Sequence, residues 1–158
     1  MNNQNSLYSI LFLLLANFAF AQSDEIKKLL EPKETDSLFI LAIENYTKEL
    51  DGLESKTIYV QYENYLSRLP KTINGFEIIK LGLANRKKYF RKNKNRLTLV
   101  EISPLTIENG LFNITLILYA AKLKGKRKLE LSYSHFHRTY FKCLNGRLIM
   151  DKTEGGGI

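Results

Sequence analysis

GLFNITLILYAAKL (residues 110–123) and KRKLELSYSHFHRTYFKCL (residues 126–144) are the stretches that decide the fold. Both are rich in β-branched and aromatic residues, which favours long β-strands. Lys124-Gly125-Lys126 suits a hairpin turn between them, and Asn145-Gly146 is the pair favoured where two successive turn residues need positive φ. We therefore expect an antiparallel meander that starts with a strand over 97–103 and ends with one over 147–152.

Upstream of the meander the pattern changes to helices and short strands. The helix over 36–51 is the clearest because its apolar residues recur with the helical period and Gly52 offers a stop. These apolar residues are Leu38, Phe39, Ala42, Ile43, Tyr46 and Leu50. Further helices are predicted over 24–30 and 83–95, and short strands over 57–63 and 76–81. The predicted fold class is α+β, with N-terminal helices followed by a curved antiparallel β-meander. The tail over 153–158 is expected to be mobile or to adopt conformations that only glycine tolerates.

The first residues predict export. Residues 7–21 form an apolar stretch that is shorter than the roughly 20 residues needed to span a bilayer. Ala19-Phe20-Ala21 matches the small-x-small pattern of a signal-peptide cleavage site, although no Lys or Arg precedes the stretch. We expect cleavage before Gln22, so that 1–21 is a signal peptide and 22–158 a single small α+β domain. The mature protein would be periplasmic or secreted.

Composition bounds the class of protein. The chain has 158 residues, of which 44% are hydrophobic and 25% charged, as in one ordinary folded domain. This balance excludes a disordered chain, a collagen, a disulfide scaffold and a multi-pass membrane protein. Cys143 is the single cysteine, so no intramolecular disulfide can form. We expect Cys143 to be a small buried hydrophobic residue rather than a reactive thiol.

Charge is distributed unevenly along the chain. The formal net charge is +8, with 8 basic and 11 acidic residues over 22–85 but 16 basic and 5 acidic over 86–158. Such a surface attracts anionic polymers, membrane or envelope surfaces, or nucleic acid, although it can also serve solubility alone. The first basic cluster is Arg86, Lys87, Lys88, Arg91, Lys92, Lys94 and Arg96, and the second is Lys122, Lys124, Lys126, Arg127 and Lys128.

The histidines of the longest strand are the main candidates for chemistry. Strict alternation over 129–143 would put Tyr133, His135 and His137 on one mostly apolar face. Two histidines at i and i+2 project about 7 Å apart, close enough to bind one metal ion or to line a ligand cavity. A metal site would need a third ligand, for which Glu101 and Glu108 are candidates. Both histidines can equally be structural residues.

The order of elements, helices first and then a curved meander of long strands, resembles the cone-shaped NTF2-like fold. In that superfamily the sheet wraps round a pocket, so the resemblance implies that Tyr133, His135 and His137 line one. Leu69-Pro70, Ile73-Asn74-Gly75-Phe76 and the closing Gly156-Gly157-Ile158 are similar to pieces of small exported bacterial proteins of unknown function.

Two functions from different classes follow. The first is an exported, non-enzymatic domain that binds a small molecule or an envelope component through Tyr133, His135 and His137. The alternative is a polyanion-binding interaction protein that uses the basic segment 86–96. An enzyme based on the histidine pair or on a metal is the third and least favoured function, because the sequence contains no recognisable catalytic motif. We assign no catalytic residue and no cofactor, and export argues against a nucleic-acid partner.

Overall fold

A computed structural model describes residues 32–50, 55–125 and 128–157. The chain divides into two compact units, Met1–Thr35 and Asp36–Ile158, and the strands belong to the second. The predicted signal peptide, its cleavage site and the predicted helix over 24–30 lie outside the described residues. Within the described ranges, no helix is long and apolar enough to cross a bilayer.

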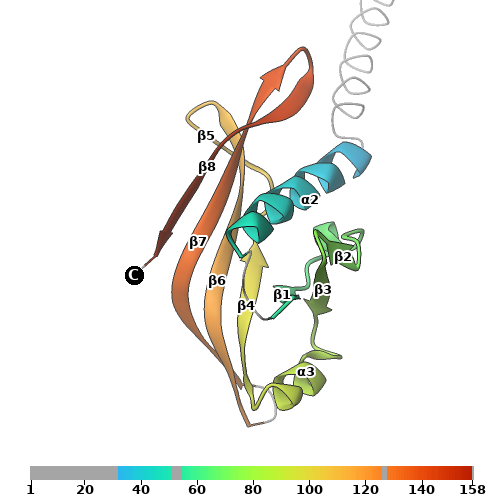
Figure 1. The fold of residues 1–158 in the computed structure, drawn as a ribbon, viewed down its shortest axis with the longest axis vertical. Helices are drawn as coiled ribbons and strands as arrows, with labels where there is room; N and C mark the ends of the chain where they lie inside the picture. The colour runs from blue at the N-terminus through green and yellow to red at the C-terminus, as the bar shows by residue number, and fades with distance from the viewer. Residues whose placement is uncertain (1–31, 51–54, 126–127, 158) are drawn as a thin grey trace, which may run out of the picture. The chain divides into compact units, whose positions relative to one another are not determined.

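The described part of the chain is dominated by strands (Figure 1). In chain order its elements are α2 (Pro32–Glu49), β1 (Thr57–Gln61), η1 (Asn64–Leu66), β2 (Thr72–Ile73), β3 (Phe76–Leu81), α3 (Arg86–Lys92), β4 (Arg96–Ile102), β5 (Thr106–Glu108), β6 (Leu111–Lys124), β7 (Lys128–Leu144) and β8 (Arg147–Gly157). The short strands β2 and β5 were not predicted. The predicted helix over 83–95 is reduced to α3.

The predicted fold class is wrong, because the strands form one mixed sheet rather than a meander that follows N-terminal helices. Within the described residues the sheet has eight strands in the order β2-β3-β1-β4-β6-β7-β8, and β5 pairs with β6. β1 lies parallel to both β3 and β4, and α3 comes between these two strands in sequence. Parallel neighbours need long connections, which η1, β2 and α3 provide. The apolar pattern of a short strand does not show the direction of its partner, so this pairing was missed.

One extra residue interrupts the pairing of β6 with β7. Leu118 pairs with His135, but the next residue, Tyr119, pairs with Tyr133, which leaves Ser134 as a bulge. Paired residues share a face, and Leu118 and Tyr119 point to opposite faces of β6. Tyr133 therefore lies on the face opposite to His135. The prediction that strict alternation runs through 129–143 is wrong.

The bulge separates two hydrophobic cores on opposite faces of the sheet. We call the face of β6 that contains Leu116 and Leu118 the α2 face, because α2 packs on it through Phe39 and Ile43. The other face is the α3 face, where Phe90 of α3 packs on a smaller core. This second core contains Leu81, Phe90, Leu99, Ala121 and Leu123. Both helices lie on the same side of β6 and β7 in Figure 1 because the long strands twist along their length.

The last strand is longer than predicted. Asn145 and Gly146 have φ of 52° and 74°, which confirms the predicted turn into β8. β8 then continues to Gly157, so the described part of the tail is a strand paired with β7, whereas we expected it to be mobile or to adopt conformations that only glycine tolerates. A Cβ added at Gly156 would lie 2.9 Å from the Phe136 ring. Glycine is therefore what lets this end of β8 approach β7.

We predict that Phe141→Ala lowers the free energy of unfolding by about 3–5 kcal/mol, because the side chain is fully buried in the α2-face core. Urea unfolding measures the change. The matched control is Ile107→Ala in β5, where the side chain is 66% exposed and a change of less than about 1 kcal/mol is expected. Equal effects of the two substitutions would contradict this description of the core.

Candidate anion-binding site

The first basic cluster is presented by α3. Asn85 fixes the turn that precedes this helix, since its Oδ1 accepts from Gly82 N at 2.9 Å and its Nδ2 donates to Lys80 O at 2.9 Å. Phe90, which is 1% exposed, anchors the helix to the sheet. The side chains on the outer surface of α3 are therefore cations. The exposed ones are Lys87, Lys88, Arg91 and Lys92.

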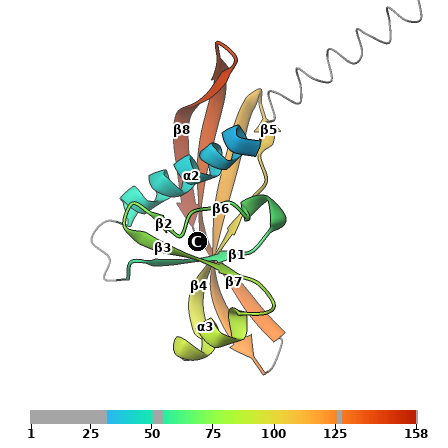
Figure 2. The ribbon, with the colours of Figure 1, turned by 90° about the vertical axis from the view of Figure 1, so that its right-hand side faces the viewer.

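The fold brings the second basic cluster to the same end of the sheet. Leu123 N donates to Asn95 O at 3.0 Å, which ties the end of β6 to the segment after α3. Figures 1 and 2 both show α3 beside the ends of β4, β6 and β7 that lie far from β5. Lys126 and Arg127 lie outside the described residues. The basic end is defined here as Arg86, Lys87, Lys88, Arg91, Lys92, Lys94, Arg96, Lys122, Lys124 and Lys128.

Among the described residues, the basic end has almost no acidic side chains that could neutralise its cations. The described residues of 82–96 and 119–132 carry ten basic side chains and one acidic one, Glu130, whereas the whole chain carries a net charge of +8. Lys124 Nζ lies 2.5 Å from Glu130 Oε1, and this hydrogen bond lowers the pKa of Glu130. The one carboxylate of the region is thus already engaged by a lysine. The positive field of the protein comes from this end.

The basic end extends over both faces of the sheet. Arg96 and Lys122 are directly opposed on β4 and β6, and the register puts both on the α2 face. α3 lies on the other face, packed on Leu99 and Leu123. The cations therefore surround the end of the sheet rather than forming one flat patch.

The three residues predicted to share a pocket have different environments. Tyr133 is 41% exposed on the α3 face, while His135 is partly exposed and His137 is 1% exposed on the α2 face. Among the described residues, no group of three or more His, Cys, Asp or Glu side chains is placed to hold a metal ion. Cys143, predicted to be buried, is exposed.

His137 is held in the core beneath α2. Its ring centroid lies 5.8 Å from that of Tyr46, and its Nδ1 lies 3.0 Å from Glu49 Oε1. This Nδ1–Oε1 contact is not aligned as a hydrogen bond, and Nε2 has no hydrogen-bond partner among the described residues. Burial lowers the pKa of His137 and outweighs the opposing effect of Glu49; His135 adds a smaller lowering effect. The imidazole is therefore neutral in the folded protein at neutral pH.

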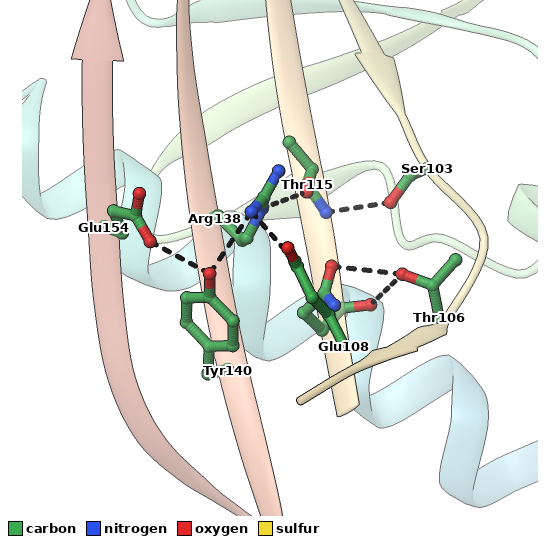
Figure 3. A network of polar contacts seen from close by, with 8 residues as sticks. Ser103, Thr106, Glu108, Thr115, Arg138, Tyr140 and Glu154 are labelled. Atoms are coloured by element: carbon green, nitrogen blue, oxygen red, sulfur yellow. Dashed lines mark hydrogen bonds and ion pairs between the residues drawn. The ribbon is translucent and has the colours of Figure 1, made fainter. Parts of the chain in front are cut away.

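Sequence reasoning missed a polar network at the opposite end of the sheet (Figure 3). Arg138 donates from Nε to Thr115 Oγ1 at 2.9 Å and from Nη1 to Glu108 Oε2 at 3.0 Å and Tyr140 OH at 3.2 Å. Tyr140 OH in turn donates to Glu154 Oε2 at 2.9 Å. The hydrogen bond with Tyr140 is the main cause that raises the pKa of Arg138. The network links β5, β6, β7 and β8, and its cation is already paired.

The alternation of β7 contained a signal for this network. Alternation alone places Phe136, Arg138 and Tyr140 next to one another on one face of β7, so the sequence indicated that the arginine and the two aromatic rings are neighbours. Their partners Glu108 and Glu154 lie 30 residues before and 16 after Arg138 in the sequence. Only the pairing of β5 with β6 and of β8 with β7 brings these carboxylates to the arginine.

We predict that folding stability decreases as the pH falls below about 6.5, the ordinary pKa of histidine. Because the pKa of folded His137 is lower than that of the unfolded chain, the unfolded state binds more protons in this range. Replacing His137 with Gln should remove up to about 1.4 kcal/mol per pH unit of this dependence. Urea unfolding between pH 7.5 and 5 measures it, with His135→Gln as the control. The same pH dependence in wild type and His137→Gln would contradict the assignment.

Comparisons with protein-family models, with curated proteins and with solved structures found no match to this chain. The NTF2-like resemblance therefore stays a prediction.

Proposed function

We propose that this protein is an exported binding domain that holds an anionic polymer at its basic end. The observation that carries the proposal is the convergence of two sequence-distant sets of basic residues around one end of the sheet: those over 86–96, and Lys122, Lys124 and Lys128. The charge excess of the described residues there, ten basic side chains to one acidic, exceeds the net charge of the whole chain. The remainder of the chain is close to neutral by comparison, so attraction is directed to this end.

Physical chemistry makes this arrangement effective for a polymer. At physiological ionic strength the Debye length is about 8 Å, so clustered charges act together whereas scattered ones are screened from each other. A polyanion that contacts several Lys and Arg side chains also releases its condensed counterions, which favours binding. The exposed cations of α3 and those of the β6–β7 end can contact successive groups of one chain.

The distribution of the cations favours a flexible polymer over a flat membrane. Arg96 and Lys122 lie on the α2 face, whereas α3 lies on the α3 face. A bilayer can contact only one side of this end at a time. A polymer that carries phosphate, sulfate or carboxylate groups can follow the charges from one face to the other.

The ligand site first predicted from sequence has less support. Tyr133 points to the face opposite to the histidines, and His137 is buried beside Glu49. A ligand would have to cross the sheet to touch all three residues. The described geometry therefore favours the alternative prediction, the basic segment 86–96 with its residues Arg86, Lys87, Lys88, Arg91, Lys92, Lys94 and Arg96.

We predict that Lys87→Gln with Arg91→Gln weakens binding to long-chain polyphosphate about tenfold or more at low salt. Removing two phosphate contacts should also reduce the slope of log affinity against log salt by roughly one to two. Fluorescence anisotropy with labelled polyphosphate, on residues 22–158, measures both quantities. The matched control, Lys71→Gln with Arg147→Gln, removes the same charge from exposed positions outside the basic end and should have little effect.

Two results would overturn the proposal. One is binding that is absent or insensitive to salt. The other is an equal loss of affinity in the two double variants, which would mean that net charge alone, and not the basic end, attracts the polymer. Phosphatidylglycerol vesicles provide the second arm, because tighter binding to vesicles than to polyphosphate would identify a membrane surface as the partner instead.

A further inference from the structure

The first part of β7 forms an open edge of the sheet. On one side of β7, Lys128–Ser134 lie beside β6. On the other side β8 reaches only as far as His135, which pairs with Gly157, and Figure 1 shows β8 ending partway along β7. Lys128–Ser134 therefore have no strand on their second side among the described residues. Such an edge can pair with another strand, because its outward N–H and C=O groups are available.

One face of this open edge is apolar. Leu129, Leu131 and Tyr133 alternate on the α3 face, and Leu131 is 43% and Tyr133 41% exposed. Their cross-strand partners on β6 are Leu123, Ala121 and Tyr119. Three rows of mostly apolar side chains thus run across β6 and β7 and stop at the edge. Exposed apolar side chains that lie together in this way mark a surface that contacts another molecule.

The outer edge of β8 is protected against strand addition, whereas the open edge of β7 is not. Bulges and charged side chains are the usual protection of an edge strand. β8 has an extra residue between those that pair with Phe141 and Tyr140. Its exposed charged residues are Arg147, Asp151, Lys152 and Glu154. The open edge of β7 contains no proline, and its two charged residues, Lys128 and Glu130, lie on the α2 face, away from the apolar rows.

The open edge is complementary to itself in an antiparallel arrangement. With a two-fold axis at Leu131, this residue faces its own counterpart in a second copy, and Leu129 faces Tyr133. On the α2 face, Glu130 faces Ser132 and Lys128 faces Ser134, so no two like charges are directly opposed. An axis at Glu130 would oppose two carboxylates. An axis at Ser132 would need the edge of His135, which β8 already occupies.

We infer that the open edge of β7 binds a second copy of this chain, in an antiparallel strand pair with Leu131 at the two-fold axis. Each apolar row then continues across four strands, β6 and β7 of one copy and β7 and β6 of the other. The outward backbone groups of both edges gain hydrogen-bond partners. Because the two strands are antiparallel, the basic ends of the two copies point away from each other. The inference does not rest on the proposed polymer binding.

Analytical ultracentrifugation of residues 22–158 tests the dimer directly. The dimer fraction should rise with protein concentration and also with salt, because salt screens the repulsion between two basic chains. Salt weakens polyphosphate binding instead, so the two proposals have opposite salt dependences and can fail independently. Sedimentation as a monomer at every salt concentration, with up to about 1 mM protein, would overturn the inference.

Two substitutions with the same change in charge test the edge itself. Leu131→Lys should weaken the dimer about tenfold, because apolar contact is lost and two ammonium groups are opposed at the axis. Ile107→Lys on β5, where the side chain is 66% exposed, should leave the dimer unchanged. Circular dichroism identifies a variant that has lost its fold, and Tyr133→Lys replaces Leu131→Lys in that case. Equal weakening by the substitutions at Leu131 and Ile107 would contradict the assigned edge.

Cross-linking tests the register of the pair. Leu131→Cys, combined with Cys143→Ser, should give a disulfide-linked dimer with glutathione disulfide as the oxidant, since directly opposed Cα atoms lie about 4.5–5.5 Å apart. Ser132→Cys in the same background should give little cross-linked dimer, because this position faces Glu130 of the second copy rather than itself. The inference is overturned if Ser132→Cys cross-links as efficiently, or if Leu131→Cys does not cross-link in a sample that sediments as a dimer.

Discussion

The pairing of β6 with β7 contains one extra residue, Ser134, and the rest of the sheet depends on that insertion. On β6 the buried positions change from Leu116 and Leu118 on one face to Ala121 and Leu123 on the other. β7 must change faces at the same point to keep its own apolar residues in contact with these. The apolar residues of β7 lie mostly at odd-numbered positions on both sides of the bulge. The bulge moves these positions from one face of the sheet to the other.

The two cores lie on opposite faces, towards opposite ends of the sheet, and the two ends differ in how their charged residues are arranged. At one end α2 covers Phe141 and the Arg138 network links four strands, so charged groups there are paired with one another. At the other end α3 needs only Phe90 and Tyr89 for packing, and its remaining surface is free to carry cations. At this second end the side chains of Thr98, Ala120 and Ser132 are exposed on the α2 face.

Local patterns predicted the positions of the long strands and of the Asn145-Gly146 turn because periodicity and turn residues act over a few neighbours. They did not predict the parallel pairing of β1, since direction is set by distant partners. The bulge also left no mark, because Tyr133 and His135 are both compatible with an unbroken strand. For the site, composition identified the basic residues, but only the tie between Leu123 and Asn95 shows that the two clusters meet.

We proposed that the basic end of the sheet binds an anionic polymer, and nuclear magnetic resonance can locate that contact residue by residue. Titration of uniformly ¹⁵N-labelled residues 22–158 with polyphosphate should shift amide signals of α3 and of the facing ends of β4, β6 and β7. Signals of the β7–β8 turn and of the Arg138 network should stay in place. Shifts centred on the Arg138 network, or no shifts at concentrations where anisotropy reports binding, would contradict the account.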